Sequence, residues 1–341
     1  MKKALIALAV LGLTGGAAVA QSSVTLFGVV DADLKYTKAN GQTLKKLDTS
    51  GLGTSRIGLR GVEDLGGGLK AGFWMESELF ADTGAADATR FWGRRATVSL
   101  SGNFGEVRLG RNKTASRLHI EEFDPYAFTG LGSTGVLYSN LGSGNSTAFG
   151  RADNLASYSL PSNLGGFYGG ADVAAPEGAV ANKHQSVRVG YKAGGLHVSG
   201  ALANAFGTTD KYKLASAAGA YDFGVVRPSL TYTQAKYGSR KQTVWTGAVT
   251  VPLGQGQLIA SYTDAKANGA AETAAAGYTP IGDAKLFAAG YVYNLSKRTA
   301  LYTTVAQIRN SGAGRLALGG SPIPSAGGKS SGADVGVRHS F

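Results

Sequence analysis

The side chains of this chain with the clearest capacity for chemistry are arginines set in stretches of alternating polarity. Arg56 and Arg60 share one face of such a stretch, while Ile57 and Leu59 occupy the other face. A guanidinium keeps its charge at every physiological pH and presents forked donors that match oxyanions. The pattern therefore predicts a polar surface that attracts anions.

Further arginines extend this surface. Arg94 and Arg95 open one stretch, Arg108 alternates with apolar neighbours in the next, and Arg151 follows a long connecting segment. Strict alternation places Arg95 rather than Arg94 on the polar face, although an irregular strand start allows either to face it. A unit charge about 4 Å away is worth roughly 1–4 kcal/mol between the dielectrics of water and of a protein surface. Each arginine therefore shifts anion occupancy by about an order of magnitude, and by less in salt.

Acidic residues accompany the arginines along the same segments. Asp31, Glu76 and Glu106 are placed to neutralise part of the positive charge. Partial neutralisation favours transit, because an ion that is held too tightly does not leave a narrow passage. For any single arginine the alternative is a solvated charge with no special role, whereas the cluster as a whole favours a functional interpretation.

Other chemistries find little support in the sequence. The chain has no cysteine, which excludes disulfides, thiolate metal sites and cysteine nucleophiles. The four histidines lack the spacing of metal ligands. Residues 130–135 match a dinucleotide-binding glycine pattern, but no strand and helix flank them as that fold requires. We therefore expect no catalytic residue, no metal site and no cofactor.

The element that must position these side chains is the β-strand, because apolar and polar residues alternate with period two along most of the chain. In residues 283–293 and 299–309 the two faces are not distinguishable, since Tyr, Ala and Thr fall on both. The predicted strands are residues 23–36, 54–62, 69–79, 93–101, 105–111, 152–160, 167–174, 185–193, 196–204, 213–222, 225–236, 241–251, 256–266, 283–293, 299–309 and 331–341.

The connections between these strands distinguish a membrane barrel from a soluble sandwich. Tight connections alternate with long ones, as expected of a barrel with short turns on one side of a membrane and long loops on the other. Sixteen strands enclose an aqueous channel, whereas eight fill the interior with side chains. The long segments are residues 38–53, 80–92, 112–150, 175–184, 267–282 and 310–330.

The two ends of the chain support export and barrel closure. Residues 1–20 combine a cationic start, an apolar stretch and an Ala-Val-Ala cleavage site, which predicts a signal peptide; an uncleaved anchor is the alternative. The mature domain is then residues 21–341. Its formal charge is +10, since Lys2 and Lys3 leave from a total of +12. Export argues against a nucleic-acid partner and favours a lumen, anionic solutes or a lipopolysaccharide surface.

The last strand is amphipathic and ends in Phe341. If it pairs with residues 23–36, the barrel closes and no unprotected strand edge remains.

Several segments resemble the general porins of the Gram-negative outer membrane, specifically a betaproteobacterial branch of anion-selective trimers. The resemblance runs over the whole chain and departs most in the long loops 112–150 and 310–330. The segments on which the resemblance rests are residues 21–28 (QSSVTLFG), 55–74 (SRIGLRGVEDLGGGLKAGFW), 98–111 (VSLSGNFGEVRLGR), 294–302 (NLSKRTALY) and 337–341 (VRHSF).

The resemblance implies a fold and a function. The fold is an all-β, 16-stranded antiparallel transmembrane barrel in which residues 112–150 fold inward as a constriction loop. The function is passive diffusion of small hydrophilic solutes, with Arg56, Arg94 and Arg151 setting a preference for anions. Family likeness also implies a homotrimer, contact with outer-membrane lipid, and recognition of Phe341 by the barrel-assembly machinery.

Within the loop, Glu121, Glu122 and Asp124 are expected to face the basic wall. Two other functions compete with a passive channel. A barrel enzyme requires a fixed catalytic set, which the sequence does not show, and an adhesive barrel would use its loops to bind a partner.

Overall fold

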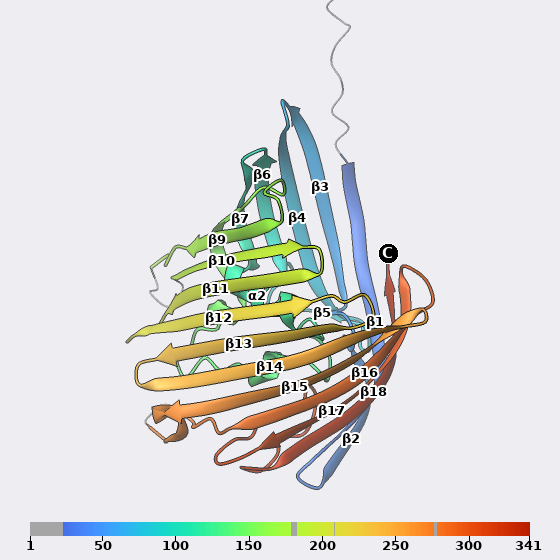
Figure 1. The fold of residues 1–341 in the computed structure, drawn as a ribbon, viewed down its shortest axis with the longest axis vertical. Helices are drawn as coiled ribbons and strands as arrows, with labels where there is room; N and C mark the ends of the chain where they lie inside the picture. Colours follow the sequence, from blue (N-terminus) through green and yellow to red (C-terminus); the bar gives the residue numbers. More distant parts are fainter. Residues whose placement is uncertain (1–22, 179–182, 208, 276–277) are drawn as a thin grey trace, which may run out of the picture.

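The computed structural model describes residues 23–178, 183–207, 209–275 and 278–341, so the predicted signal peptide and Gln21 lie outside the described residues. The described chain is almost entirely antiparallel sheet (Figure 1). Its elements are β1 (Ser23–Ala39), β2 (Gln42–Thr49), β3 (Arg56–Gly66), β4 (Leu69–Phe80), β5 (Ala85–Ala86), β6 (Arg95–Gly102), β7 (Gly105–Lys113), α2 (Ala115–Phe123), η1 (Thr134–Leu137), η2 (Thr147–Phe149), β8 (Arg151–Ser159), β9 (Phe167–Ala174), β10 (His184–Ala193), β11 (Leu196–Phe206), β12 (Lys211–Tyr221), β13 (Arg227–Tyr237), β14 (Arg240–Leu253), β15 (Gly256–Gly269), η4 (Ala270–Glu272), β16 (Ala284–Asn294), β17 (Thr299–Asn310) and β18 (Lys329–Ser340).

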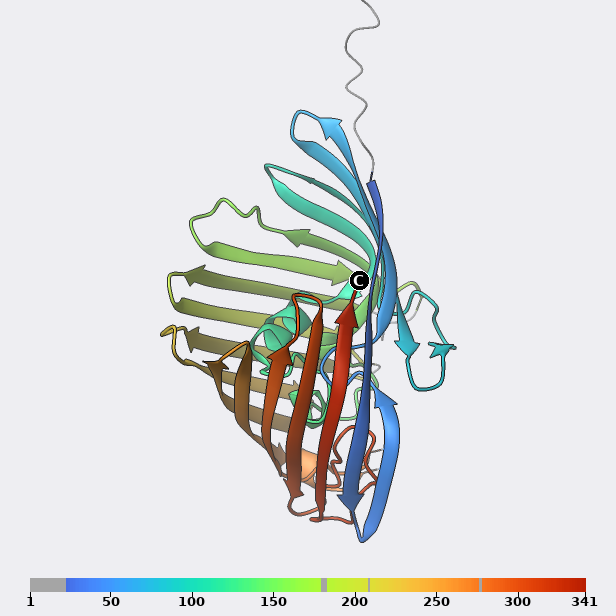
Figure 2. The same cartoon turned by 90° about the vertical axis from the view of Figure 1, so that its right-hand side faces the viewer.

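The sheet closes on itself. β1 pairs with β18 from Val29↔Ser340 to Ala39↔Ser330, and on its other edge it pairs with β2 and then with β3. β2 and β3 therefore act as one interrupted strand, while β5 belongs to a short arm that projects outside the wall (Figure 2). Counted in this way the wall has sixteen strands, and the predicted barrel is confirmed.

The expectation of a long loop over residues 38–53 is wrong. β1 continues to Ala39, turns through Asn40 (φ 50°) and Gly41 (φ 74°), and returns as β2. Both turn residues adopt the left-handed conformation, which an Asn-Gly pair tolerates well and which matches the twist of a two-residue hairpin. The hairpin lengthens this part of the wall.

Outward and inward faces follow the predicted alternation in β1. Val24, Leu26 and Leu34 are exposed on the outside, whereas Asp33 and Lys35 are buried inside. In a membrane barrel the outer face contacts lipid and the inner face lines or fills the lumen. Among the residues that the structure describes, no helix is long and apolar enough to cross a membrane.

In β16 and β17, where the sequence left the faces unassigned, apolar residues occupy both sides of the wall. Leu286 and Ile308 are buried inside, while Phe287 and Val305 are exposed outside. The inner residues are apolar because they pack against the long loop that follows β7. The alternation of polarity is lost where protein, rather than water, covers the inner wall.

That loop, residues 114–150, folds into the barrel, as predicted. α2 contacts the inner faces of β10–β13, and Leu131, Leu137 and Leu141 enter one apolar cluster with the wall residues Tyr212 and Leu286. Full burial of a leucine side chain contributes about 1.5–3 kcal/mol. Three such leucines hold the loop against the wall as a fixed internal partition.

The interruption between β2 and β3 is held by one buried carboxylate. The backbone amides of Gly51, Leu52 and Gly53 donate to Asp31 at 3.1, 3.0 and 2.6 Å. The hydroxyl of Tyr302 donates to the same carboxylate at 2.5 Å. Asp31 thereby fixes the path of residues 50–55, which lead directly into the lumen-facing Arg56.

Replacement of Asp31 by Asn is expected to lower the free energy of unfolding by about 1–3 kcal/mol, because the amide loses charge-assisted acceptance of these donors. The urea midpoint of the folded band in cold gel electrophoresis measures the effect. Asp64→Asn is the matched control, since Asp64 accepts only the exposed amide of Gly66. Equal midpoints for the two variants would contradict the role assigned to Asp31.

Candidate functional site: the pore constriction

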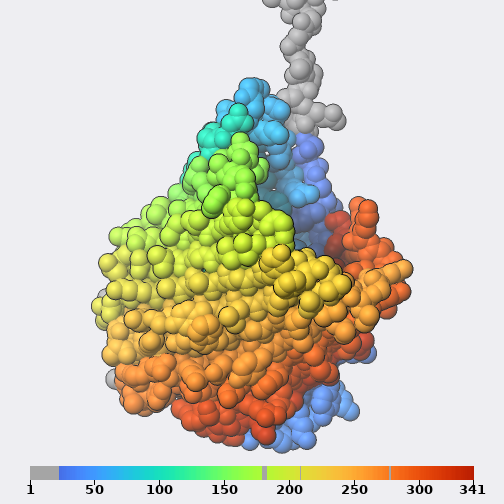
Figure 3. Space-filling view, viewed as in Figure 1, coloured from blue at the N-terminus to red at the C-terminus, as the bar shows by residue number. Residues whose placement is uncertain are grey.

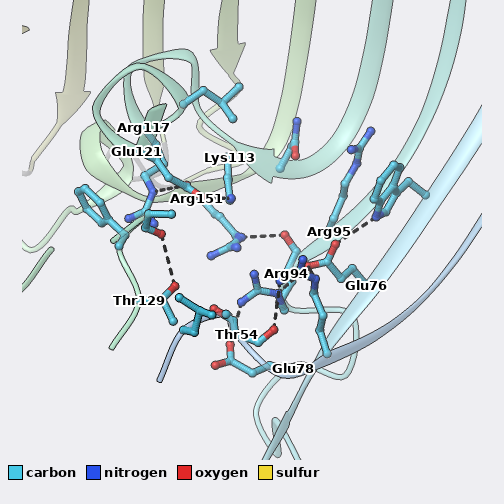
Figure 4. A pocket seen from close by; sticks show the side chains of 18 of the residues that line it. Thr54, Glu76, Glu78, Arg94, Arg95, Lys113, Arg117, Glu121, Thr129 and Arg151 are labelled. Carbon is cyan, nitrogen blue, oxygen red and sulfur yellow. Dashed lines mark hydrogen bonds and ion pairs between the residues drawn. The ribbon is translucent and has the colours of Figure 1, made fainter. Parts of the chain in front are cut away.

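The internal partition and the facing wall enclose a hollow of about 580 Å³. Seven cationic and three acidic side chains line it, so its formal charge is +4. Figure 4 shows these charged side chains converging from the wall and from the loop. The hollow is lined by Leu52, Gly53, Thr54, Arg56, Trp74, Glu76, Glu78, Arg94, Arg95, Arg108, Asn112, Lys113, Arg117, Leu118, Glu121, Ala127, Phe128, Thr129 and Arg151.

Glu76 organises two of the predicted arginines. Arg94 Nε donates to Glu76 Oε1 at 2.6 Å, and Arg94 Nη1 reaches Glu78 at 3.4 Å. Arg56 Nε lies 3.6 Å from the same oxygen of Glu76. The Arg94 side chain is only 10% exposed, so its charge is largely committed to the wall.

Arg95 and Arg151 are held differently. Arg151 Nε donates to the carbonyl of Arg94 at 2.8 Å. Arg95 Nε donates to the Thr97 hydroxyl at 3.0 Å, and its guanidinium lies 4.4 Å from the ring centroid of Trp74. Within the described part of the chain neither arginine has a carboxylate at ion-pair distance. Neither charge is therefore neutralised by a direct ion pair within that part of the chain.

Both Arg94 and Arg95 line the hollow, although strict alternation allows only one of them. Arg94 precedes the first residue of β6, and its amide donates to the carbonyl of Glu76 at 3.1 Å. Because the chain enters β6 from an irregular turn, the pleat does not yet separate these neighbours onto opposite faces.

The end of β7 and the loop each supply a cation that was not predicted from the sequence, Lys113 and Arg117 respectively. Lys113 Nζ and Arg117 Nε donate to Glu121 at 2.6 and 2.9 Å, and the Arg117 guanidinium lies 3.8 Å from the Phe128 ring centroid. Burial raises the pKa of Glu121, but Lys113 and Arg117 lower it more, so that the pKa lies below the ordinary value. The i,i+4 spacing of Arg117 and Glu121 on α2 was the available signal.

Two predicted arginines of the wall sit at the margin of this site. Arg108 lines the hollow and pairs with Glu106 at 2.5 Å, whereas Glu106 itself lies outside the lining. Arg60 also lies outside it and stacks over Phe27 and Trp74, 5.4 and 5.3 Å from their ring centroids.

Asp124 does not face the basic wall. It follows the last residue of α2 and accepts the backbone amides of Tyr126, Phe128 and Thr134 at 2.8, 3.2 and 3.0 Å. Burial raises the pKa of Asp124 by more than these hydrogen bonds lower it, so the pKa lies above its ordinary value. A carboxylate directly after a helix is well placed to accept hydrogen bonds from the backbone amides of the turn that follows. Asp124 therefore stabilises the conformation of the loop.

Glu122 points toward the opposite side of the barrel from the arginine cluster. Its carboxylate lies 3.4 Å from Arg188 and 3.3 Å from His197, on β10 and β11. Like Asp31, it holds structure together rather than lining the hollow.

Phe341 completes the closure of the wall. The amide of Gly28 donates to the carbonyl of Phe341, and the amide of Phe341 donates to Gly28, each at 3.1 Å. An added Cβ at Gly28 would lie 2.3 Å from the ring of Phe341, so the small residue makes room for the terminal aromatic side chain. Within the described ranges, no group of three or more His, Asp or Glu side chains is placed to hold a metal ion.

A closed sixteen-stranded barrel with an internal loop and a charged hollow defines a pore of the outer membrane. The chain belongs to the Gram-negative porin family, whose model matches residues 7–313. It is 41% identical to outer membrane porin protein 32 of Delftia acidovorans over the full length of both chains. It is 31% identical, again over both full lengths, to an outer membrane porin of Bordetella pertussis.

Solved structures agree with this assignment. The structure of an anion-selective porin from Comamonas acidovorans superposes with a TM-score of 0.84 at 36% identity, covering 94% of this chain and 100% of that one. OmpT of Vibrio cholerae, at 17% identity, shares the fold with a TM-score of 0.69, covering 94% of this chain and 99% of that one. The protein is therefore an outer-membrane porin.

Replacement of Glu76 by Gln is expected to raise the formal charge of the lining from +4 to +5. The reversal potential in a salt gradient across a planar bilayer should move toward the anion equilibrium potential. The free energy of unfolding should fall by about 1–3 kcal/mol, because two partly buried guanidinium groups lose the negative charge of their partner and keep only a neutral acceptor. Glu63→Gln makes the same change outside the lining and should leave both quantities unchanged; equal shifts in the two variants would contradict this account of Glu76.

Proposed function

We propose that this porin passes small hydrophilic solutes by passive diffusion and prefers anions. The observation that carries the preference is the +4 formal charge of the lining, together with two arginines, Arg95 and Arg151, that have no carboxylate partner among the described residues. The anion-selective porin from Comamonas acidovorans, with its TM-score of 0.84, supports the same direction.

The selectivity residues in this proposal are Arg56, Arg94, Arg95 and Arg151, with Arg60 and Arg108 contributing at the margin. Glu76, Glu106 and Glu121 moderate the field, because a solute that meets only positive charge would be retained. Asp31 and Asp124 support the lining segments through backbone hydrogen bonds.

Passive diffusion is favoured over an outer-membrane enzyme by the burial of the His–Ser contacts of α2. His119 contacts the hydroxyls of Ser199 and Ser216 at 2.9 and 3.0 Å. Burial lowers the pKa of His119 to about 4, and the side chain is fully enclosed between α2 and the wall. A substrate therefore has no path to it.

The remaining partners follow from the family and from the surface of the barrel. We propose cleavage of residues 1–20 to leave the domain 21–341, and recognition of Phe341 by the barrel-assembly machinery. We further propose assembly as a homotrimer, in which the arm that carries β5 projects from the wall toward a neighbouring copy (Figure 2). The outer wall meets outer-membrane lipid and lipopolysaccharide. No nucleic acid is among the proposed partners.

Planar bilayers test the channel and its preference. The wild-type protein should give stepwise open channels, and the triple variant R56Q/R95Q/R151Q should keep them while its anion-over-cation permeability ratio falls several-fold. The difference should shrink in 1 M salt, where the Debye length is about 3 Å instead of about 10 Å at 0.1 M.

The matched control is K70Q/K297Q/R298Q, which removes three positive charges outside the lining. It should keep the wild-type permeability ratio. Absence of conducting steps in the wild type would reject the porin function itself, and an unchanged ratio in the arginine variant would reject the selectivity cluster alone.

A further inference from the structure

Three lysines stand side by side on the outer face of the barrel. Lys213 of β12 lies directly opposite Lys236 of β13, and Lys236 lies directly opposite Lys241 of β14. Directly opposed residues have Cβ atoms about 4.5–5.5 Å apart, and like charges at this spacing repel. Among the described residues, none of the three has a carboxylate at ion-pair distance, so the row lacks a counter-charge within the chain.

An apolar groove of about 450 Å³ runs along the outer wall below this row. Outward-facing small residues, Gly200, Ala215 and Ala217, form its floor, and larger apolar side chains flank it. These strands cross the face shown in Figure 3 as a green-to-yellow band. The groove is lined by Val187, Val189, Gly200, Ala201, Leu202, Ala215, Ser216, Ala217 and Tyr232.

A second hollow of about 300 Å³ joins the groove to the lysines. It shares Leu202 and Ala215 with the groove and is bordered by Lys213 and Lys236. At this junction the lining changes from apolar to polar. The polar groups there are Gln234 and the hydroxyl of Tyr232, and Gln234 Nε2 donates to that hydroxyl at 2.8 Å. The two hollows thus form one continuous site with an apolar body and a cationic head.

The site has the orientation of an outer-leaflet lipid. Lys213 lies near the end of β12 that joins the long-loop side of the barrel, and Tyr221, beside Phe223, lies at the opposite end. Eight residues separate Lys213 from Tyr221, which corresponds to about 26 Å along the strand. With a strand tilt of about 40° this is roughly 20 Å across the membrane, close to the apolar band of about 25 Å. The lysines therefore lie at the level of the external head groups.

We propose that this groove binds a phosphorylated glycolipid of the outer leaflet, the lipid A portion of lipopolysaccharide. An acyl chain lies in the apolar groove, and a sugar phosphate lies between Lys213, Lys236 and Lys241. A phosphate accepts charge-assisted hydrogen bonds from several ammonium groups at once and supplies the missing counter-charge. The inference rests on the lipid contact proposed above and gives it a particular place and residues.

A second row of cations lies on the same rim, beside a wall of different composition. Lys285 lies opposite Arg309, and Arg309 lies opposite Lys329. The wall beside this row carries large rings instead of small residues, because Phe287 stacks with Tyr262 at 4.9 Å and with the Arg309 guanidinium at 5.6 Å. The second row therefore serves as a control for the removal of three cations, and Asp264 lies directly opposite its Lys285.

Native mass spectrometry of the purified full-length mature porin, with added bis-phosphorylated lipid A in detergent, tests the proposal. The wild type should retain lipid A, and K213S/K236S/K241S should retain at least fivefold less. The control K285S/R309S/K329S should stay within twofold of the wild type. Dephosphorylated lipid A should bind the wild type as weakly as lipid A binds the first variant.

A groove-filling variant tests the apolar part without changing charge. At Gly200 an added Cβ meets only the carbonyl of Ser216, at 3.6 Å, so Gly200→Leu fills the groove without a clash and should lower retention at least fivefold. Gly247 also faces outward, on β14, and an added Cβ there meets nothing within 4 Å. Gly247→Leu is therefore the matched control and should retain lipid A as the wild type does.

Equal retention by all variants, or equal binding of dephosphorylated lipid A, would overturn the proposal. Tighter binding of phosphatidylglycerol than of lipid A would assign the groove to a glycerophospholipid and would also overturn it. Conductance of each variant in bilayers free of lipid A reports folding and the pore separately, so a failure of the channel is distinguishable from a failure of the lipid site.

Discussion

Every feature of this porin depends on the closure of one ladder of backbone hydrogen bonds. Lipid offers no partner for an amide or a carbonyl, so a sheet in the membrane cannot keep a free edge. The pairing of β1 with β18, completed by the reciprocal bonds between Gly28 and Phe341, removes that edge. Once the barrel is closed, its wall has a defined inside and outside. Alternate residues of each strand then face lipid on the outside, and water or protein on the inside.

Closure alone gives a wide tube, and the internal loop narrows that tube to one side of the barrel. Burial of apolar residues against β11–β17 fixes the loop, and ion pairs centred on Glu121 present Lys113 and Arg117 to the lumen. The facing wall contributes arginines of two kinds. Arg94 is paired with Glu76 and Glu78, whereas Arg95 and Arg151 have no carboxylate at ion-pair distance among the described residues.

The sequence predicted the barrel well because period-two alternation directly records which side of a wall meets water. It failed at β16 and β17, where the loop makes both sides apolar, and at Asn40-Gly41, whose turn chemistry was overlooked. Within the site, alternation and family likeness predicted Arg56, Arg95 and Arg151, and all three line the hollow. Lys113 lies at the last residue of β7, beyond the predicted strand end at residue 111, and Arg117 lies on a helix within a segment expected to be a loop, where only its i,i+4 spacing to Glu121 was informative. The carboxylates of Asp31 and Asp124 accept backbone amides of nearby loops, and such local hydrogen bonding leaves no pattern in the sequence.

The packing of the loop against one side of the barrel makes the open passage eccentric. The hollow is lined by β3, β4, β6–β8 and the loop, whereas most inner side chains of β12–β17 are buried behind the partition. Inward-facing residues therefore divide into two populations with different physical environments. Those of the sealed half are constrained like the interior of a water-soluble protein, by volume and shape, whereas those of the open half are free to vary in size but not in charge. A single barrel thus contains a packed core and a channel in adjoining sectors of one circumference.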